Sequence, residues 1–78
     1  MATYNLKETR ILPSTTDEEG NTIPRRIEFA YVKQVEDITS QPHRGVFRAD
    51  QLDKEFAIAA DGTKRTGQQI LDDAGVSL

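Results

Sequence analysis

Few residues of this 78-residue chain have the types and spacing that ligand chemistry requires. Residues 62–67 read Gly-Thr-Lys-Arg-Thr-Gly, with two glycines at the spacing of a phosphate-binding loop. Such a loop continues with Lys and Ser or Thr, which reach the terminal phosphates and magnesium, whereas Gln68 and Gln69 follow here. A nucleotide site is therefore not predicted. The weaker alternative is an anion held by Lys64, Arg65 and the free amides that begin the next helix.

Three basic pairs would form a positive patch if the fold brought them onto one face. They are Arg25-Arg26, His43-Arg44 and Lys64-Arg65. Anion binding is accordingly assigned to the candidates Arg25, Arg26, Lys64 and Arg65, with scattered surface charge as the simpler interpretation. The net charge of −3 lacks the basic excess of a dedicated nucleic-acid binder, so nucleic acid is not the expected partner.

The remaining polar residues do not form a catalytic or metal-binding set. His43 is the only histidine, and its nearest acids, Asp37 and Asp50, fall in predicted loops. The acidic run Asp17, Glu18 and Glu19 lacks the spaced oxygen ligands of a calcium loop and indicates a solvated hairpin tip. We therefore expect no enzyme activity, no metal or other cofactor, and no small-molecule substrate.

Composition sets the broad class. The chain is 36% hydrophobic and 29% charged, which is typical of a folded domain, and it has no cysteine for disulfides or thiolate metal sites. No apolar run is long enough to cross a bilayer, and the first residues lack a signal-peptide core. We expect one small domain over residues 1–78, in a cytoplasm or, for a phage-encoded protein, a virion. A core of this size is small, so a partner or self-association could add stability.

The clearest structural pattern is the alternation of apolar and polar residues over 27–35, which predicts a strand with one buried face. Its apolar row consists of Ile27, Phe29, Tyr31 and Val35. A preceding strand over residues 3–12 and a turn signal near Gly20 predict an antiparallel hairpin over residues 3–35 with a protruding polar tip. Two registers remain open: Ile11 opposite Ile27, which places Arg10 opposite Glu28, or a register shifted by one residue.

The second half of the chain is predicted as shorter elements. A loop over residues 36–45 precedes a short strand at 46–49, and residues 50–60 fit either a strand or a helix, with the strand slightly favoured. Residues 66–74 predict a helix with a capping box at its start and a glycine at its end. The expected fold is α+β: a small antiparallel sheet of three or four strands, led by the N-terminal hairpin, with the C-terminal helix packed on one face.

One helix cannot cover both faces of such a sheet. Ile11, Ala30 and Val32 are assigned to the parity opposite the aromatic row, and we expect them to form an exposed apolar patch. Together with the acidic tip Asp17, Glu18 and Glu19, they are the candidate partner-binding residues. These features predict a non-enzymatic protein–protein interaction module that binds a protein partner or associates with itself.

The cysteine-free chain with its long projecting hairpin is similar in general character to small accessory proteins of bacteriophage particles, such as capsid-decorating or head–tail joining components. The resemblance implies a structural role in virion assembly. The alternative is a small phage-type regulator that docks on a host enzyme or nucleic-acid machine, with the tip and Asp72-Asp73 engaging a basic groove. A third option is weak nucleic-acid binding through the basic pairs.

Overall fold

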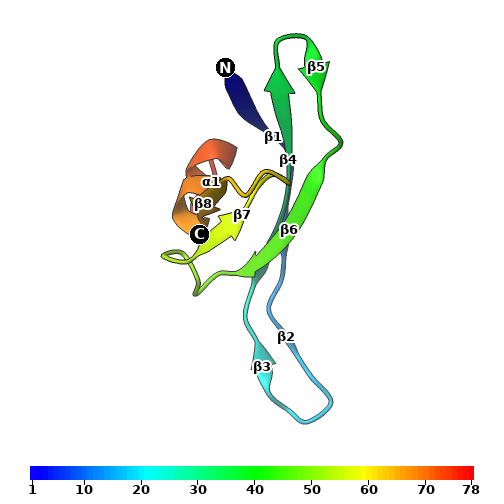
Figure 1. Cartoon of the computed structure of the whole chain (residues 1–78). Helices are drawn as coiled ribbons and strands as arrows, with labels where there is room; N and C mark the ends of the chain where they lie inside the picture. The colour runs from blue at the N-terminus through cyan, green and yellow to red at the C-terminus, as the bar shows by residue number, and fades with distance from the viewer.

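The main sheet is built around β4 (Arg26–Val35), because each of its other strands pairs with β4. The computed structural model describes all 78 residues. β1 (Ala2–Leu12) lies antiparallel along one side of β4. β6 (His43–Arg48) and the two-residue β5 (Ile38–Thr39) lie antiparallel along the other side. The result is one long, narrow sheet (Figure 1).

Two small ribbons and a helix complete the fold. β2 (Thr15–Thr16) pairs with β3 (Thr22–Ile23), and β7 (Glu55–Ala57) pairs with β8 (Lys64–Thr66). The β7–β8 hairpin and α1 (Gly67–Ala74) lie on one side of the main sheet (Figure 1). The predicted α+β fold is confirmed, with an antiparallel sheet led by the N-terminal strands and the C-terminal helix packed on it. No helix in the structure has the length and apolar character needed to cross a membrane.

The core lies between the middle of the sheet and the β7–β8–α1 layer. Its fully packed members are Ile27, Phe29, Tyr31, Phe47, Ile58, Ile70 and Leu71. The predicted aromatic row therefore faces the interior as far as Tyr31. The ring of Phe29 lies against Gly45 on the neighbouring strand, where an added Cβ would be 2.5 Å from the ring Cζ. Gly45 is thus the residue that lets Phe29 lie flat in the core.

The hairpin register is the first of the two alternatives. Ile11 lies opposite Ile27, and Arg10 lies opposite Glu28 with Arg10 Nε 3.8 Å from the Glu28 carboxylate. The register shifts between Leu6 and Glu8, which marks a β-bulge in β1. Because of this bulge, Leu6 and Ile11 both lie on the core side although their sequence parities differ.

The second half corrects several predicted boundaries. The short strand begins at His43 rather than at residue 46, and the predicted loop 36–45 contains β5. Within residues 50–60 the strand interpretation holds for β7 only, since residues 50–54 form turns. Gly62, at φ 89°, occupies the left-handed position of the β7–β8 hairpin. The helix is confirmed with its capping box between Thr66 and Gln69.

A buried tyrosine joins the helix to the sheet. The Tyr31 hydroxyl donates a 2.6 Å hydrogen bond to Oδ2 of Asp73 in α1. Arg65 of β8 places its Nε 3.4 Å from the same oxygen and its guanidinium carbon 5.8 Å from the centre of the Tyr31 ring. Burial, and then the hydrogen bond to Asp73, raise the pKa of Tyr31 well above its ordinary 10.0.

Gly45→Ala tests the close contact with Phe29. The added methyl group must displace a ring that is only 3% exposed, so the free energy of unfolding should fall by about 1–3 kcal/mol. Urea titration followed by circular dichroism measures it. Val46→Thr, at the exposed neighbouring position, is the control and should change stability by less than about 0.5 kcal/mol. Equal effects at the two positions would contradict this packing.

Tyr31→Phe tests the bond to Asp73. At neutral pH the variant should be less stable by about 1–2 kcal/mol, since the hydroxyl and its hydrogen bond are lost. Tyr31 ionises at higher pH when folded than when unfolded, so its contribution is complete below about pH 10 and is lost as the pH rises beyond it. The stability difference, measured by thermal melting, should therefore shrink in alkaline solution. A difference that stays constant through that range would rule out the linkage.

Candidate functional site

The most prominent surface feature is a hairpin arm, defined here as residues 13–24. It continues β1 and β4 beyond the core, and no other element lies beside it (Figure 1). All residues from 13 to 22 are exposed, and only Ile23 and Pro24 are half-buried. The molecule is consequently elongated, with principal dimensions of 49 × 21 × 18 Å.

The turn of the arm has a defined conformation. The N–H of Asp17 donates to the carbonyl of Asn21 at 2.9 Å, and that of Gly20 donates to the Asp17 carbonyl at 3.1 Å. Asp17 Oδ1 accepts from the N–H groups of Glu19 and Asn21 at 3.0 and 2.9 Å. Gly20 has φ 84°, the left-handed position that closes a three-residue hairpin loop. Asp17 therefore holds the turn, while the Glu18 and Glu19 side chains form the exposed tip.

The expected apolar patch on the opposite face is not formed. Ala30 and Val32 lie on that face but are only 1% and 5% exposed. Ala30 lies between Glu8 of β1 and Arg44 of β6, whose side chains form a 2.6 Å ion pair. Ile11 does not share this face at all, because it lies opposite Ile27 on the core side, where it is 42% exposed. The prediction of one open apolar surface is wrong, since Ala30 and Val32 are buried and the Glu8–Arg44 ion pair flanks Ala30.

The basic pairs also lie apart. Arg65 lies against Tyr31, whereas Arg26 is five residues away along β4, roughly 16 Å at the rise of a strand. Arg26 lies opposite Arg48, and its Nε is buried without a hydrogen-bond partner. Arg25 is exposed, and neither it nor Arg26 has a carboxylate within 4.0 Å. The four anion-binding candidates thus form two separate groups, and Lys64 remains an exposed residue of β8.

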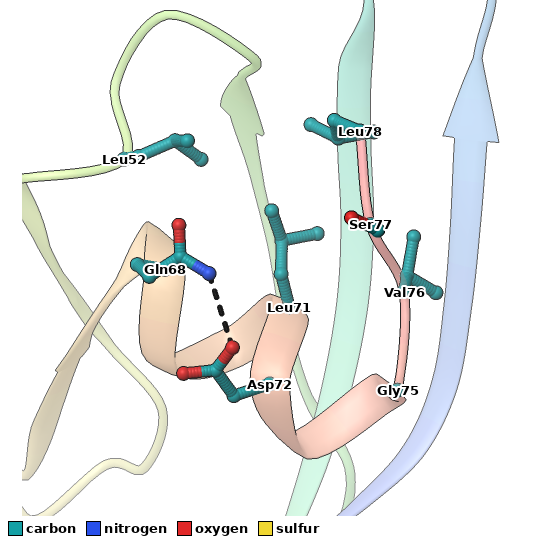
Figure 2. Close-up of a pocket in the computed structure, with 8 residues that line it drawn as sticks. All are labelled: Leu52, Gln68, Leu71, Asp72, Gly75, Val76, Ser77 and Leu78. Atoms are coloured by element: carbon teal, nitrogen blue, oxygen red, sulfur yellow. Dashed lines mark hydrogen bonds between the residues drawn. The ribbon is translucent and has the colours of Figure 1, made fainter.

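Three surface hollows are present. Figure 2 shows the first, of about 420 Å³, between the end of α1, the C-terminal tail and the loop after β6. Leu52, Leu71, Val76 and Leu78 supply its apolar walls, and Gln68 Nε2 donates to Asp72 Oδ1 at 3.0 Å on its rim. A second, of about 540 Å³, adjoins Asp61, and a third, of about 180 Å³, surrounds the Glu8–Arg44 pair. Ser40 and His43 both line the 540 Å³ hollow, but the Ser40 hydroxyl donates to the Gln41 carbonyl at 3.0 Å and accepts from the Lys33 N–H at 2.8 Å, with no hydrogen bond to His43.

The polar groups beside the second hollow latch the β7–β8 turn to the sheet. Asp61 Oδ2 is 2.7 Å from Lys33 Nζ and accepts a 2.6 Å hydrogen bond from the Tyr4 hydroxyl. The Thr63 N–H donates to Oδ1 at 2.9 Å. The bond from Lys33, followed by those from Tyr4 and Thr63, holds the pKa of Asp61 far below its usual 3.8. The same pair raises the pKa of Lys33. An ionised carboxylate used in this way positions structure and is a poor proton donor.

His43 lies near this latch and lines the same hollow. It is half-buried and lies opposite Tyr31 in the sheet. The structure contains no group of three or more His, Cys, Asp or Glu side chains arranged to hold a metal ion.

One exposed apolar pair was not anticipated. Val35 and Ile38 face each other across the end of the β4–β5 hairpin and are 40% and 72% exposed. Between them Glu36 has φ 56°, an uncommon conformation for a residue with a side chain. The alternating pattern predicted that Val35 is buried with the aromatic row. The layer of β7, β8 and α1 does not reach that end of β4, so Val35 is exposed.

Asp61→Asn tests the latch. An aspartate whose pKa is lowered by folding stabilises the protein above its unfolded-state pKa, and this contribution is lost as the pH falls below about 4. The variant should therefore melt at a lower temperature than the wild type at neutral pH, with the gap narrowing in acid. Asp53→Asn, at an exposed site without an ion pair, is the control and should leave the melting curve unchanged. A gap independent of pH would refute the assignment.

Comparison with protein families, with curated proteins and with solved structures finds no match to this chain.

Proposed function

We propose that the protein is a non-enzymatic protein–protein interaction module, serving as a small accessory structural component of a larger assembly of the bacteriophage-particle type. The observation that carries this proposal is the arm. It has a defined turn and an exposed surface, and it packs against nothing else in the chain. Within this proposal the protein resides in the host cytoplasm until it joins the assembled particle.

The physical basis is the cost of an isolated ribbon. A two-stranded hairpin is at best marginally stable by itself in water, and both outer edges of β2 and β3 have unpaired backbone groups. A partner that adds a strand, or that packs on the ribbon, supplies the contacts that the chain lacks. The arm therefore has the properties of an element that becomes buried in a complex.

The titratable groups support a structural role. The Asp61 carboxylate is ion-paired with Lys33 and accepts a hydrogen bond from Tyr4. The Asp73 carboxylate accepts a hydrogen bond from Tyr31 and is ion-paired with Arg65. Each of these carboxylates fastens one part of the fold to another.

The alternative is a regulator that docks its acidic tip into a basic groove of a host enzyme or nucleic-acid machine. The negative charge of the arm favours this alternative, because residues 13–24 contain three acids and no Lys or Arg. Asp72 and Asp73 add little to such a surface, since Asp72 is bonded to Gln68 and Asp73 to Tyr31. The two functions differ in stoichiometry: many ordered copies in an assembly, or one or two per target. Direct nucleic-acid binding, the third option, would require affinity that falls steeply with salt.

Replacing residues 13–25 with Asn-Gly tests the role of the arm. The shortened chain retains every fully packed core residue, so it should fold and give a cooperative thermal transition. Tagged full-length and shortened proteins are expressed in the natural host, and assemblies are purified by size and viewed by electron microscopy. Full-length protein should co-purify in many copies per assembly, and the shortened one should be lost from it.

Equal incorporation of the two proteins would contradict a role for the arm. A full-length protein found at one or two copies on a single target would instead favour the regulator.

A further inference from the structure

We infer that the arm packs face to face, in antiparallel orientation, on the arm of a second copy of this chain, so that the acidic tip of each lies against the basic base of the other. The tip is Glu18 and Glu19, and the base is Arg25 and Arg26. This inference rests on the proposed function, because it identifies a second copy of the chain as the protein that the arm binds.

The tip of the arm and the base next to it carry opposite charges that do not neutralise one another. Glu19 lies in the turn, and the extended stretch from Asn21 to Arg25 alone spans roughly 13 Å. That exceeds the screening length of about 8 Å at physiological salt, so tip and base of one molecule hardly interact. The straight hairpin also prevents the tip from folding back, since its register continues without a slip from Leu12–Arg26 to Thr15–Ile23.

The base lacks compensation within its own molecule. Arg25 and Arg26 have no carboxylate within 4.0 Å, and Arg26 faces Arg48 directly across the sheet. Like charges directly opposite each other destabilise a strand pair. The base is nevertheless held in place, because the Ala49 N–H donates to the Arg25 carbonyl at 2.8 Å. A positioned cationic surface with unmet charge therefore lies at one end of the arm.

An apolar strip connects the two charged ends. Ile11, 42% exposed, and Ile23, half-buried, lie on the core-side face of the hairpin as it leaves the core. Alternation along the arm puts Pro13 and Arg25 on this same side and Arg26 on the opposite face. Arg25 is therefore the arginine of the base that faces the partner's strip. Two such strips packed face to face would remove the exposed isoleucine surface from water.

A two-fold axis through the middle of the arm satisfies all of these features at once. Such an interface uses the same patch on both copies, so each tip meets the other copy's base and both charge contacts form together. An unrelated protein would need the same distance between a basic and an acidic group, whereas a second copy of the chain already has both groups at that distance. The second copy is thus the occupant that the charges favour.

Charge exchange provides the test. Glu18→Lys/Glu19→Lys gives an arm that is basic at both ends, and Arg25→Glu/Arg26→Glu gives one that is acidic at both ends. Sedimentation equilibrium of the full chain, from micromolar to millimolar concentration, should show a wild-type dimer. Each variant alone should associate roughly tenfold more weakly or worse, because like charges now face each other. An equimolar mixture of the two should restore association as a heterodimer.

Lys54→Glu/Lys64→Glu is the matched control, since it changes the net charge as much as the arginine reversals at exposed sites outside the arm. It should dimerise like the wild type. If the double arginine variant fails to melt cooperatively, Arg25→Glu alone, at an exposed site, replaces it in the test.

A wild type that stays monomeric at millimolar concentration overturns the inference, as does a mixture of the reversed variants that remains monomeric. Self-association that both reversals leave unchanged overturns it too. These results leave the proposed function standing if full-length protein still joins assemblies through its arm. If the full-length protein dimerises but does not join assemblies through its arm, the proposed function is overturned and the pairing of the arms stands.

Discussion

Burial of Ile27, Phe29 and Tyr31 along one face of β4 is the contact on which the rest of the structure depends. β1, β5 and β6 all pair with β4, and the β7–β8 hairpin and α1 pack over its aromatic row. Because the chain is short, its core lies against this one face, where Phe47, Ile58, Ile70 and Leu71 complete it. Gly45 lets the Phe29 ring approach its neighbouring strand, and Asp73 satisfies the buried Tyr31 hydroxyl. Apolar burial and polar satisfaction therefore occur on the same strand.

A core confined to the middle of a long sheet leaves both of its ends without cover. At one end the β4–β5 hairpin exposes Val35 and Ile38, and at the other the arm continues as a ribbon without a layer against it. The stretch between them is well paired: Asp61 and Lys33 close one side, and Glu8 and Arg44 cross the other face. Charges in the middle of the sheet thus form ion pairs within the molecule, whereas those of the arm and its base do not. This contrast is the physical reason for placing the interaction surface at the arm.

Local patterns predicted the elements whose signals are short-range. The strand over residues 27–35 and the capping box of the helix each depend on neighbours in sequence, and both are confirmed. The patch of Ile11, Ala30 and Val32 was wrong for long-range reasons, because Ala30 and Val32 are buried by neighbouring strands and the hairpin register places Ile11 on the core side. A bulge near Lys7 reverses the parity of β1, so Leu6 and Ile11 reach the same face. Alternation in a single strand contains no information about a slip in its partner.

Composition and periodicity by themselves determined that the chain forms an antiparallel sheet with one capped helix, that it lacks thiols, and that three of its thirteen acids lie at a hairpin turn. Only the tertiary structure decided which charges are used. It paired Asp61 with Lys33 and Asp73 with Arg65 across long stretches of sequence, and left Glu18, Glu19, Arg25 and Arg26 without such partners. The reason is geometric: an ion pair needs its two groups within about 4 Å, and only the folded chain sets that distance.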